Sequence, residues 1–161
     1  MSKDISIGPG ILNGKCTYAN RNFKKGEIVM SWDLLEVSQK DFVTMPKEEK
    51  IFVHSFWGKM YKFSFPACYT NHSPNANTIA DYEQFCDLAT TDIKKGDKIT
   101  TNATLEYKFE VESFLETREG KELEDFTWVS GGYRNAEVMY KVNGETKHLK
   151  LKRVGNWQII S

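Results

Sequence analysis

The sequence lacks any excess of charge of one sign. Its 161 residues include 22 Lys and Arg and 22 Asp and Glu, so the formal net charge is zero. Proteins that bind nucleic acid by bulk electrostatics carry a positive excess, and the balance here argues against such a partner. With 40% hydrophobic residues, the chain is expected to bury a real core in one domain, or in one domain with an appendage.

Long hydrophobic runs are also absent. The opening residues, Met1 to Ile7, contain no apolar core of signal-peptide length. No later stretch approaches the length that a membrane-spanning helix requires. We therefore expect a cytoplasmic or nuclear protein without membrane association.

Cysteine is scarce. Cys16, Cys68 and Cys86 are widely spaced and form no Cys-x-x-Cys pair, so we predict free thiols and no disulfide framework. A zinc site from Cys68, His72 and Cys86 is arithmetically available, but its spacing matches no usual zinc module, and we predict no metal. A nucleophilic Cys–His pair stays open, although no family-like flank surrounds any of the cysteines.

What the sequence does contain is one dense polar stretch, Tyr69 to Asn77. Its asparagines, histidine and proline favour an irregular turn over a helix or a simple hairpin. Asn71 and His72 side chains both donate and accept hydrogen bonds, which suits a polar heteroaromatic guest such as adenine. The alternative is an Asx-rich loop that satisfies only its own backbone.

One turn signature occurs twice, in Phe23–Glu27 and in Ile93–Asp97. Each copy has an apolar residue, two lysines, a glycine and an acid, and each precedes a strand-like run. Two equivalent turns that lead into two strands indicate a fold assembled from small sheets. We interpret the lysines as parts of solvated turns, not as a binding patch.

Helical patterns are few. Ser38–Asp41 resembles a capping box, and after Pro46 a helix is predicted from Lys47 to Phe56. A short helix is predicted around Glu110 to Thr117. The charged residues from Thr117 to Asp125 then indicate a linker.

The rest of the chain is β-like. Asn143-Gly144 predicts a two-residue hairpin turn and Gly155-Asn156 a second turn, which gives a three-stranded meander. Such a meander is too small to be stable alone, so it should pack on the main body or on a partner, and a homodimer contact is one option. The predicted division is residues 1–117 as the main domain and 118–161 as linker and appendage.

With these segments placed, a resemblance can be stated. The chain from about Gly10 to Tyr107 resembles a compact SET domain, the protein-lysine methyltransferase fold that uses S-adenosylmethionine. Four blocks carry the likeness in the family's order, and Asn-His-Ser followed by Pro-Asn is the most specific: Gly14–Ala19, Phe23–Glu27, Thr70–Asn75 and Asp92–Thr100. The layout is similar to small, free-standing viral or bacterial members without flanking zinc modules.

The resemblance implies a fold class and a cofactor. The fold is mainly β with short helices, in small twisted sheets around a C-terminal pseudoknot, here followed by the C-terminal meander. A methyl group would pass from S-adenosylmethionine to a lysine of a protein partner, a histone or another basic protein. Matching the motifs assigns five residues to the cofactor: Lys15, Cys16, Tyr18, Asn71 and His72.

The sequence departs from the family pattern at the reaction centre. Ala103 stands where the family's catalytic tyrosine is expected, and Tyr107 is the candidate to line the lysine channel in its place. Cys16 replaces the second glycine of the cofactor turn. Two hypotheses follow: a protein-lysine N-methyltransferase that uses Tyr107, or a SET-fold pseudoenzyme that binds a lysine-bearing partner without turning it over.

Overall fold

The computed structural model describes residues 3–161, and Met1 and Ser2 lie outside the described residues. The chain divides into two compact units: unit 1 is Met1–Leu35 with Phe63–Ala103, and unit 2 is Glu36–Lys62 with Thr104–Ser161. Five small sheets and a few helices make the fold mainly β, as the sequence predicted. The 117/118 division drawn from the sequence falls inside the last helix, α3 (Ala103–Glu119).

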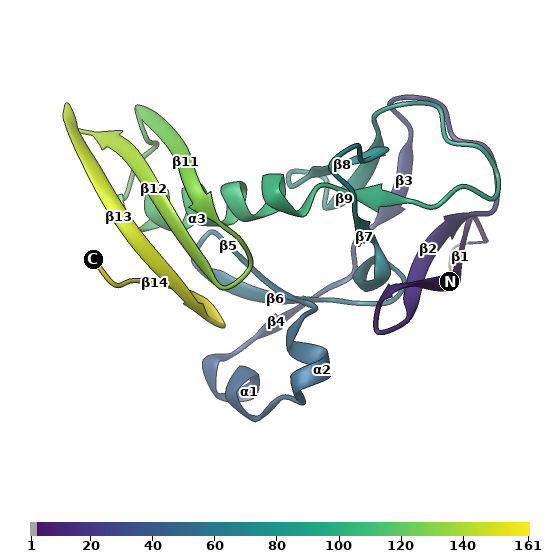
Figure 1. Ribbon diagram of the computed structural model, residues 1–161, viewed down its shortest axis with the longest axis horizontal. Coiled ribbons are helices and arrows are strands. Elements are labelled where there is room, and N and C mark those ends of the chain that lie inside the picture. The colour runs from purple at the N-terminus through teal and green to yellow at the C-terminus, as the bar shows by residue number, and fades with distance from the viewer. Residues whose placement is uncertain (1–2) are drawn as a thin grey trace. The chain divides into compact units, whose positions relative to one another are not determined.

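Unit 1 is built from short strands. An antiparallel pair, β1-β2, a three-stranded sheet of order β3-β9-β8 and a parallel pair, β7-β10, make up the unit, and buried apolar side chains of β1, β2, β3 and β9 share one core (Figure 1). The elements are β1 (Ile5–Leu12), β2 (Lys15–Ala19), β3 (Ile28–Ser31), the 3-10 turn η1 (Ala67–Tyr69), β7 (Asn71–His72), β8 (Thr78–Asp81), β9 (Cys86–Ala89) and β10 (Thr100–Thr101).

The two lysine-glycine turns of unit 1 pair with each other almost symmetrically. Phe23 and Ile93 exchange both backbone hydrogen bonds, at 2.8 and 2.9 Å. The amide of Gly26 donates to the carbonyl of Ala89, and the amide of Gly96 donates to that of Ala19, each at 2.8 Å. Both glycines have positive φ, 88° and 94°, the conformation that the turn signature predicted. The repeat seen in the sequence is therefore a pair of turns that are hydrogen-bonded to each other and to the last residues of β2 and β9.

The remaining elements lie wholly or mostly in unit 2. A sheet of order β4-β6-β5 and two short helices precede α3, and a four-stranded antiparallel sheet follows it. The elements are β4 (Leu34–Val37), α1 (Gln39–Thr44), α2 (Lys47–Lys50), β5 (Val53–Phe56), β6 (Lys59–Phe63), α3, β11 (Asp125–Gly131), β12 (Asn135–Val142), β13 (Glu145–Val154) and β14 (Asn156–Ile159).

Two helix predictions were wrong in extent. The helix expected from Lys47 to Phe56 ends at Lys50, and Val53–Phe56 is strand β5, joined to β6 by a tight turn at Trp57 and Gly58. Both turn residues have positive φ, 51° and 74°, so the hairpin overrides a short apolar run that fits either structure. The helix expected from Glu110 begins instead at Ala103 and runs to Glu119.

The C-terminal sheet has one strand more than predicted. The sequence indicated the three strands that correspond to β12, β13 and β14, and the turns at Asn143-Gly144 and Gly155 are confirmed. Strand β11 pairs with β12 as the fourth strand. One face of this sheet packs on Val111 and Leu115 of α3, which covers its apolar side chains within unit 2 (Figure 1).

A buried ionic cluster lies beneath this sheet. Glu110 of α3 is 1% exposed, and its carboxylate contacts His54 Nδ1 at 2.7 Å and accepts from Trp157 Nε1 at 3.2 Å. Arg153 Nη1 lies 2.9 Å from Glu110 Oε2 as an ion pair, without an aligned hydrogen bond, and its guanidinium covers the ring of Tyr133. A charge in this position is tolerable only because partners of opposite sign surround it.

The stability of the protein is expected to fall with acid through Glu110. Burial by itself would raise the pKa of Glu110, but the charge of Arg153 and the hydrogen bond with His54 outweigh it and the pKa is lowered. A lowered folded-state pKa adds stability above the unfolded value of about 4.3, and that stability is lost as pH falls through the folded value. The free energy of unfolding, measured with urea at several pH values from neutral to acid, should fall more steeply with decreasing pH for the native chain than for Glu110→Gln. Equal slopes would contradict this.

Candidate functional site

The site is built on the hairpin between β1 and β2. Asn13 and Gly14 form its two-residue loop with φ of 50° and 74°, the conformation that suits an Asn-Gly turn. A Cβ atom on Gly10 would lie 2.3 Å from the carbonyl oxygen of Lys15, so only glycine permits this close approach. The glycines noted in the sequence thus shape a narrow backbone loop.

Asn71 fastens this hairpin to β7. Its Oδ1 accepts from the amide of Ile11 at 2.9 Å, and its Nδ2 donates to the carbonyls of Lys15 and Tyr69, each at 3.0 Å. The side chain is buried, with 6% of its surface exposed. Both amide hydrogens are used by the protein, so Asn71 positions the two loops and has no donor left for a ligand.

His72 joins the same region to the start of α3. Its Nδ1 accepts from the backbone amide of Ala103 at 3.1 Å, and because an amide only donates, Nδ1 carries no proton in this arrangement. The backbone around His72 is held by β10, since Thr101 pairs with His72 and its carbonyl accepts from Ser73 at 2.9 Å. Strand β10 therefore lies directly beside the Asn-His segment.

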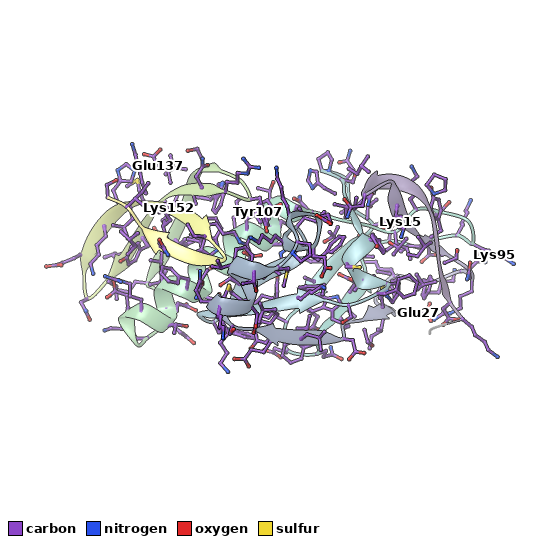
Figure 2. The ribbon with its side chains drawn as sticks, turned by 90° about the horizontal axis from the view of Figure 1, so that it is seen from below. Lys15, Glu27, Lys95, Tyr107, Glu137 and Lys152 are labelled. Carbon is purple, nitrogen blue, oxygen red and sulfur yellow. The ribbon has the colours of Figure 1, made fainter. Side chains whose placement is uncertain are left out.

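The other expected cofactor residues divide into two groups. Lys15 is exposed, and its ammonium lies 4.9 Å from the ring centre of Tyr69, a cation–π contact (Figure 2). Cys16 is fully buried in β2, where it pairs with Gly8, and burial raises the pKa of its thiol, so none of its surface is open to a ligand. Tyr18 instead lies over Gly8, donates to the carbonyl of Pro9 at 2.7 Å and lines a separate hollow.

Tyr107 belongs to unit 2. Its ring meets the ring of Tyr133 edge-on, with 6.1 Å between the ring centres. Burial, and then the nearby charge of Glu110, raise the pKa of Tyr107 to about 12. At neutral pH its hydroxyl therefore stays protonated, so it can donate or accept a hydrogen bond but cannot act as a base.

Sequence reasoning missed three groups that complete the site. They are the amide of Ile11, the carbonyl of Tyr69 and the amide of Ala103, all backbone atoms. Side-chain patterns carry no direct signal for such partners. Tyr69 alone was indicated, because it is the first residue of the polar stretch.

The comparisons with known proteins agree with this fold. The family model for the SET domain matches residues 14–102, which is more than half of the chain, and the chain therefore belongs to the SET-domain family, as the resemblance predicted. Among solved structures it is similar to a Plasmodium falciparum protein named "putative histone methyltransferase", with a TM-score of 0.52 and 18% identity over 63% of this chain and 94% of that one. At this identity the likeness shows the fold. A search of the curated proteins found no match.

Two further findings concern all of the residues that the structure describes. Across residues 3–161, no three His, Cys, Asp or Glu side chains are grouped so as to hold a metal ion. In the same residues, every helix is too short or too polar to cross a membrane.

Proposed function

We propose that this protein transfers a methyl group from S-adenosylmethionine to a lysine side chain of a protein substrate. The observation that carries the proposal is the bracing of the glycine hairpin against the Asn-His segment by Asn71. This brace sets an exposed cation, Lys15, and irregular backbone side by side, and irregular backbone can pair with a ligand instead of a sheet.

The residues present fit the cofactor. Lys15 would offer its ammonium to the carboxylate of the methionine part, and the exposed His72 would offer backbone groups to the nucleoside, while the fully buried Cys16 stays an expectation of the resemblance. Asn71 would act by holding these loops, because its own amide is already engaged. Tyr18 stays an expectation of the resemblance. When bound, the cofactor supplies a methyl group on a positively charged sulfur, which a neutral amine can attack.

The chain's own part in the reaction is to orient and desolvate the lysine amine. A neutral amine is the nucleophile, and burial lowers the pKa of a lysine toward that form. Tyr107 is the proposed positioning group. Its protonated hydroxyl can accept a hydrogen bond from the lysine amine or donate one to it, but it cannot act as the base that removes the amine's proton. The expected substrate is a basic protein such as a histone, and no nucleic acid is expected.

A second function is favoured by one observation. Ala103 has no hydroxyl to offer, and its amide is already used by His72. A SET-fold binding module that holds a lysine-bearing partner without methylating it would tolerate this loss. The two functions differ in whether any methyl group is transferred.

Methyl transfer is expected from the native chain. Incubation with labelled S-adenosylmethionine and a lysine-rich protein should label the protein, and Tyr107→Phe should reduce the rate by about a hundredfold, the usual cost of one positioned polar group. Tyr61→Phe is the matched control, because this hydroxyl lies outside the proposed site. Failure of the native chain together with a large gain in Ala103→Tyr would favour the binding module.

Cofactor binding has its own test. A ligand that prefers the folded state raises its stability, by about 2.7 kcal/mol at a hundred times its dissociation constant. The melting temperature of the native chain should therefore rise with saturating S-adenosylmethionine. An unchanged melting temperature would rule against the cofactor assignment and the enzyme together.

A further inference from the structure

A groove of about 450 Å³ opens on unit 1, and none of the residues assigned to the cofactor lines it. We call it the β3 groove. It is lined by β3 and the residues after it, by the residue before β1 and by the segment before η1: Ile28–Asp33, Asp4, Phe65 and Pro66. None of these belongs to the site formed by the β1-β2 hairpin, Asn71 and His72.

The floor of the β3 groove is an edge strand. In the order β3-β9-β8, strand β3 has a neighbour on one side only. Ile28 at its beginning is 46% exposed and Ser31 at its end is exposed, while Val29 and Met30 between them are buried, so the two ends of the strand are its accessible part. An edge strand presents unpaired backbone groups to any extended segment that lies along it, and strand addition of this kind is a recurring way to bind peptides.

The walls of the groove favour a positive charge. Within residues 3–161, the exposed carboxylate of Asp33 has no ion pair or hydrogen bond, whereas that of Asp4 is paired with Arg21 at 3.0 Å. Two acids line the groove, and since Arg21 compensates the charge of Asp4, a cation entering the groove gains attraction chiefly from Asp33.

Phe65 adds a surface that suits the same guest. Its ring is 50% exposed at the wall of the groove. An aromatic face attracts an ammonium or guanidinium group, and it also packs against the methylene stem of a long basic side chain.

We propose that the β3 groove binds an extended, basic segment of a partner protein, which pairs with the free edge of β3 and places a lysine or arginine side chain against Asp33 and Phe65. This docking site is separate from methyl transfer, and the proposal does not depend on the proposed function.

The alternative occupants fit the charges less well. In a symmetric pairing of two β3 edges, neither copy would bring a cation to the unpaired Asp33 of the other, because the residues that line the groove include no Lys or Arg. A nucleic acid would bring phosphates to the same carboxylates. A basic segment is the occupant whose charge complements the groove.

The test uses fluorescence anisotropy with the full chain and a short labelled peptide that alternates lysine with threonine and valine. The matched probes are the same peptide with glutamine for lysine, and a copy with N-methyl groups that block strand pairing along one edge. The protein variants are Asp33→Lys and Phe65→Leu in the groove. Glu83→Lys is the control for charge, because Glu83 is an exposed acid of unit 1 that does not line the groove.

We expect the lysine peptide to bind the native chain and to lose roughly tenfold or more in affinity with Asp33→Lys, since a rim attraction becomes a repulsion. Phe65→Leu and the N-methylated probe should bind more weakly as well. Asp33 and Glu83 are both exposed, so these variants should fold, and circular dichroism checks this.

Three results would overturn the proposal. They are equal binding of the glutamine peptide, an equal loss with Glu83→Lys, and full binding of the N-methylated probe. Concentration-dependent dimerisation of the native chain that Asp33→Lys abolishes, with no peptide binding, would assign the groove to a second copy instead.

Discussion

Replacing Glu110 with alanine is expected to lower the free energy of unfolding by about 3–5 kcal/mol, the cost of removing one partner from a buried ion pair. The change leaves Arg153, whose side chain is 3% exposed, with no opposing charge, and it leaves the indole of Trp157 without its acceptor. Domains of this size are stable by about 5–15 kcal/mol. The loss is therefore a large share of the total, and urea unfolding at neutral pH measures it.

The matched control for this change is Glu112→Ala on the same helix. Burial, and then repulsion from Glu116, raise the pKa of Glu112, so its charge is disfavoured in the folded protein. We expect the control to change the unfolding free energy by no more than about 0.5 kcal/mol. An equal effect of the two substitutions would show that the ionic cluster around Glu110 contributes no more to stability than a carboxylate outside the cluster.

Asn71→Asp is expected to disrupt the candidate site, although it changes a single atom. The Nδ2 donor becomes an oxygen that faces the carbonyls of Lys15 and Tyr69, so two hydrogen bonds become repulsive contacts. A buried polar group left without its partner costs about 1–3 kcal/mol. The melting temperature should fall, and the stabilisation by S-adenosylmethionine should disappear, because the hairpin is no longer held against the Asn-His segment.

Asn75→Asp provides the comparison for Asn71→Asp. Asn75 lies in the same polar stretch but is exposed, and within residues 3–161 only its backbone amide is engaged, with the hydroxyl of Ser73 at 3.2 Å. This variant should keep both the native melting temperature and its response to the cofactor. If Asn71→Asp also kept the native melting temperature and its rise with the cofactor, the hydrogen bonds of Asn71 between the hairpin and β7 would not be needed for cofactor binding.

Local residue patterns predicted a good part of this fold. The paired turns with Gly26 and Gly96, and the Asn143-Gly144 hairpin, depend on backbone conformations that glycine or asparagine favours, and such preferences are legible in the sequence. The Asn71-His72 segment was found for a similar reason, because its dense polar residues fit no regular element. Membership of the SET-domain family followed from the order of these blocks.

Other elements were misread because short apolar runs fit more than one structure. Val53–Phe56 continued a helical pattern, and only its pairing with β6 makes it a strand. Strand β11 was missed, although it pairs with β12 along most of its length. In both segments the hydrogen-bonding partner, not the local preference, decides the conformation.

By itself the sequence determined the family and the two lysine-glycine turns. Only the tertiary structure decided which groups meet at the glycine hairpin, because the amide of Ile11 and the carbonyl of Lys15 meet Asn71 across more than fifty residues of chain. The same holds for the cluster of His54, Glu110 and Arg153. A buried charge or amide takes whatever partner the packed chain brings to it, and no local pattern records that partner.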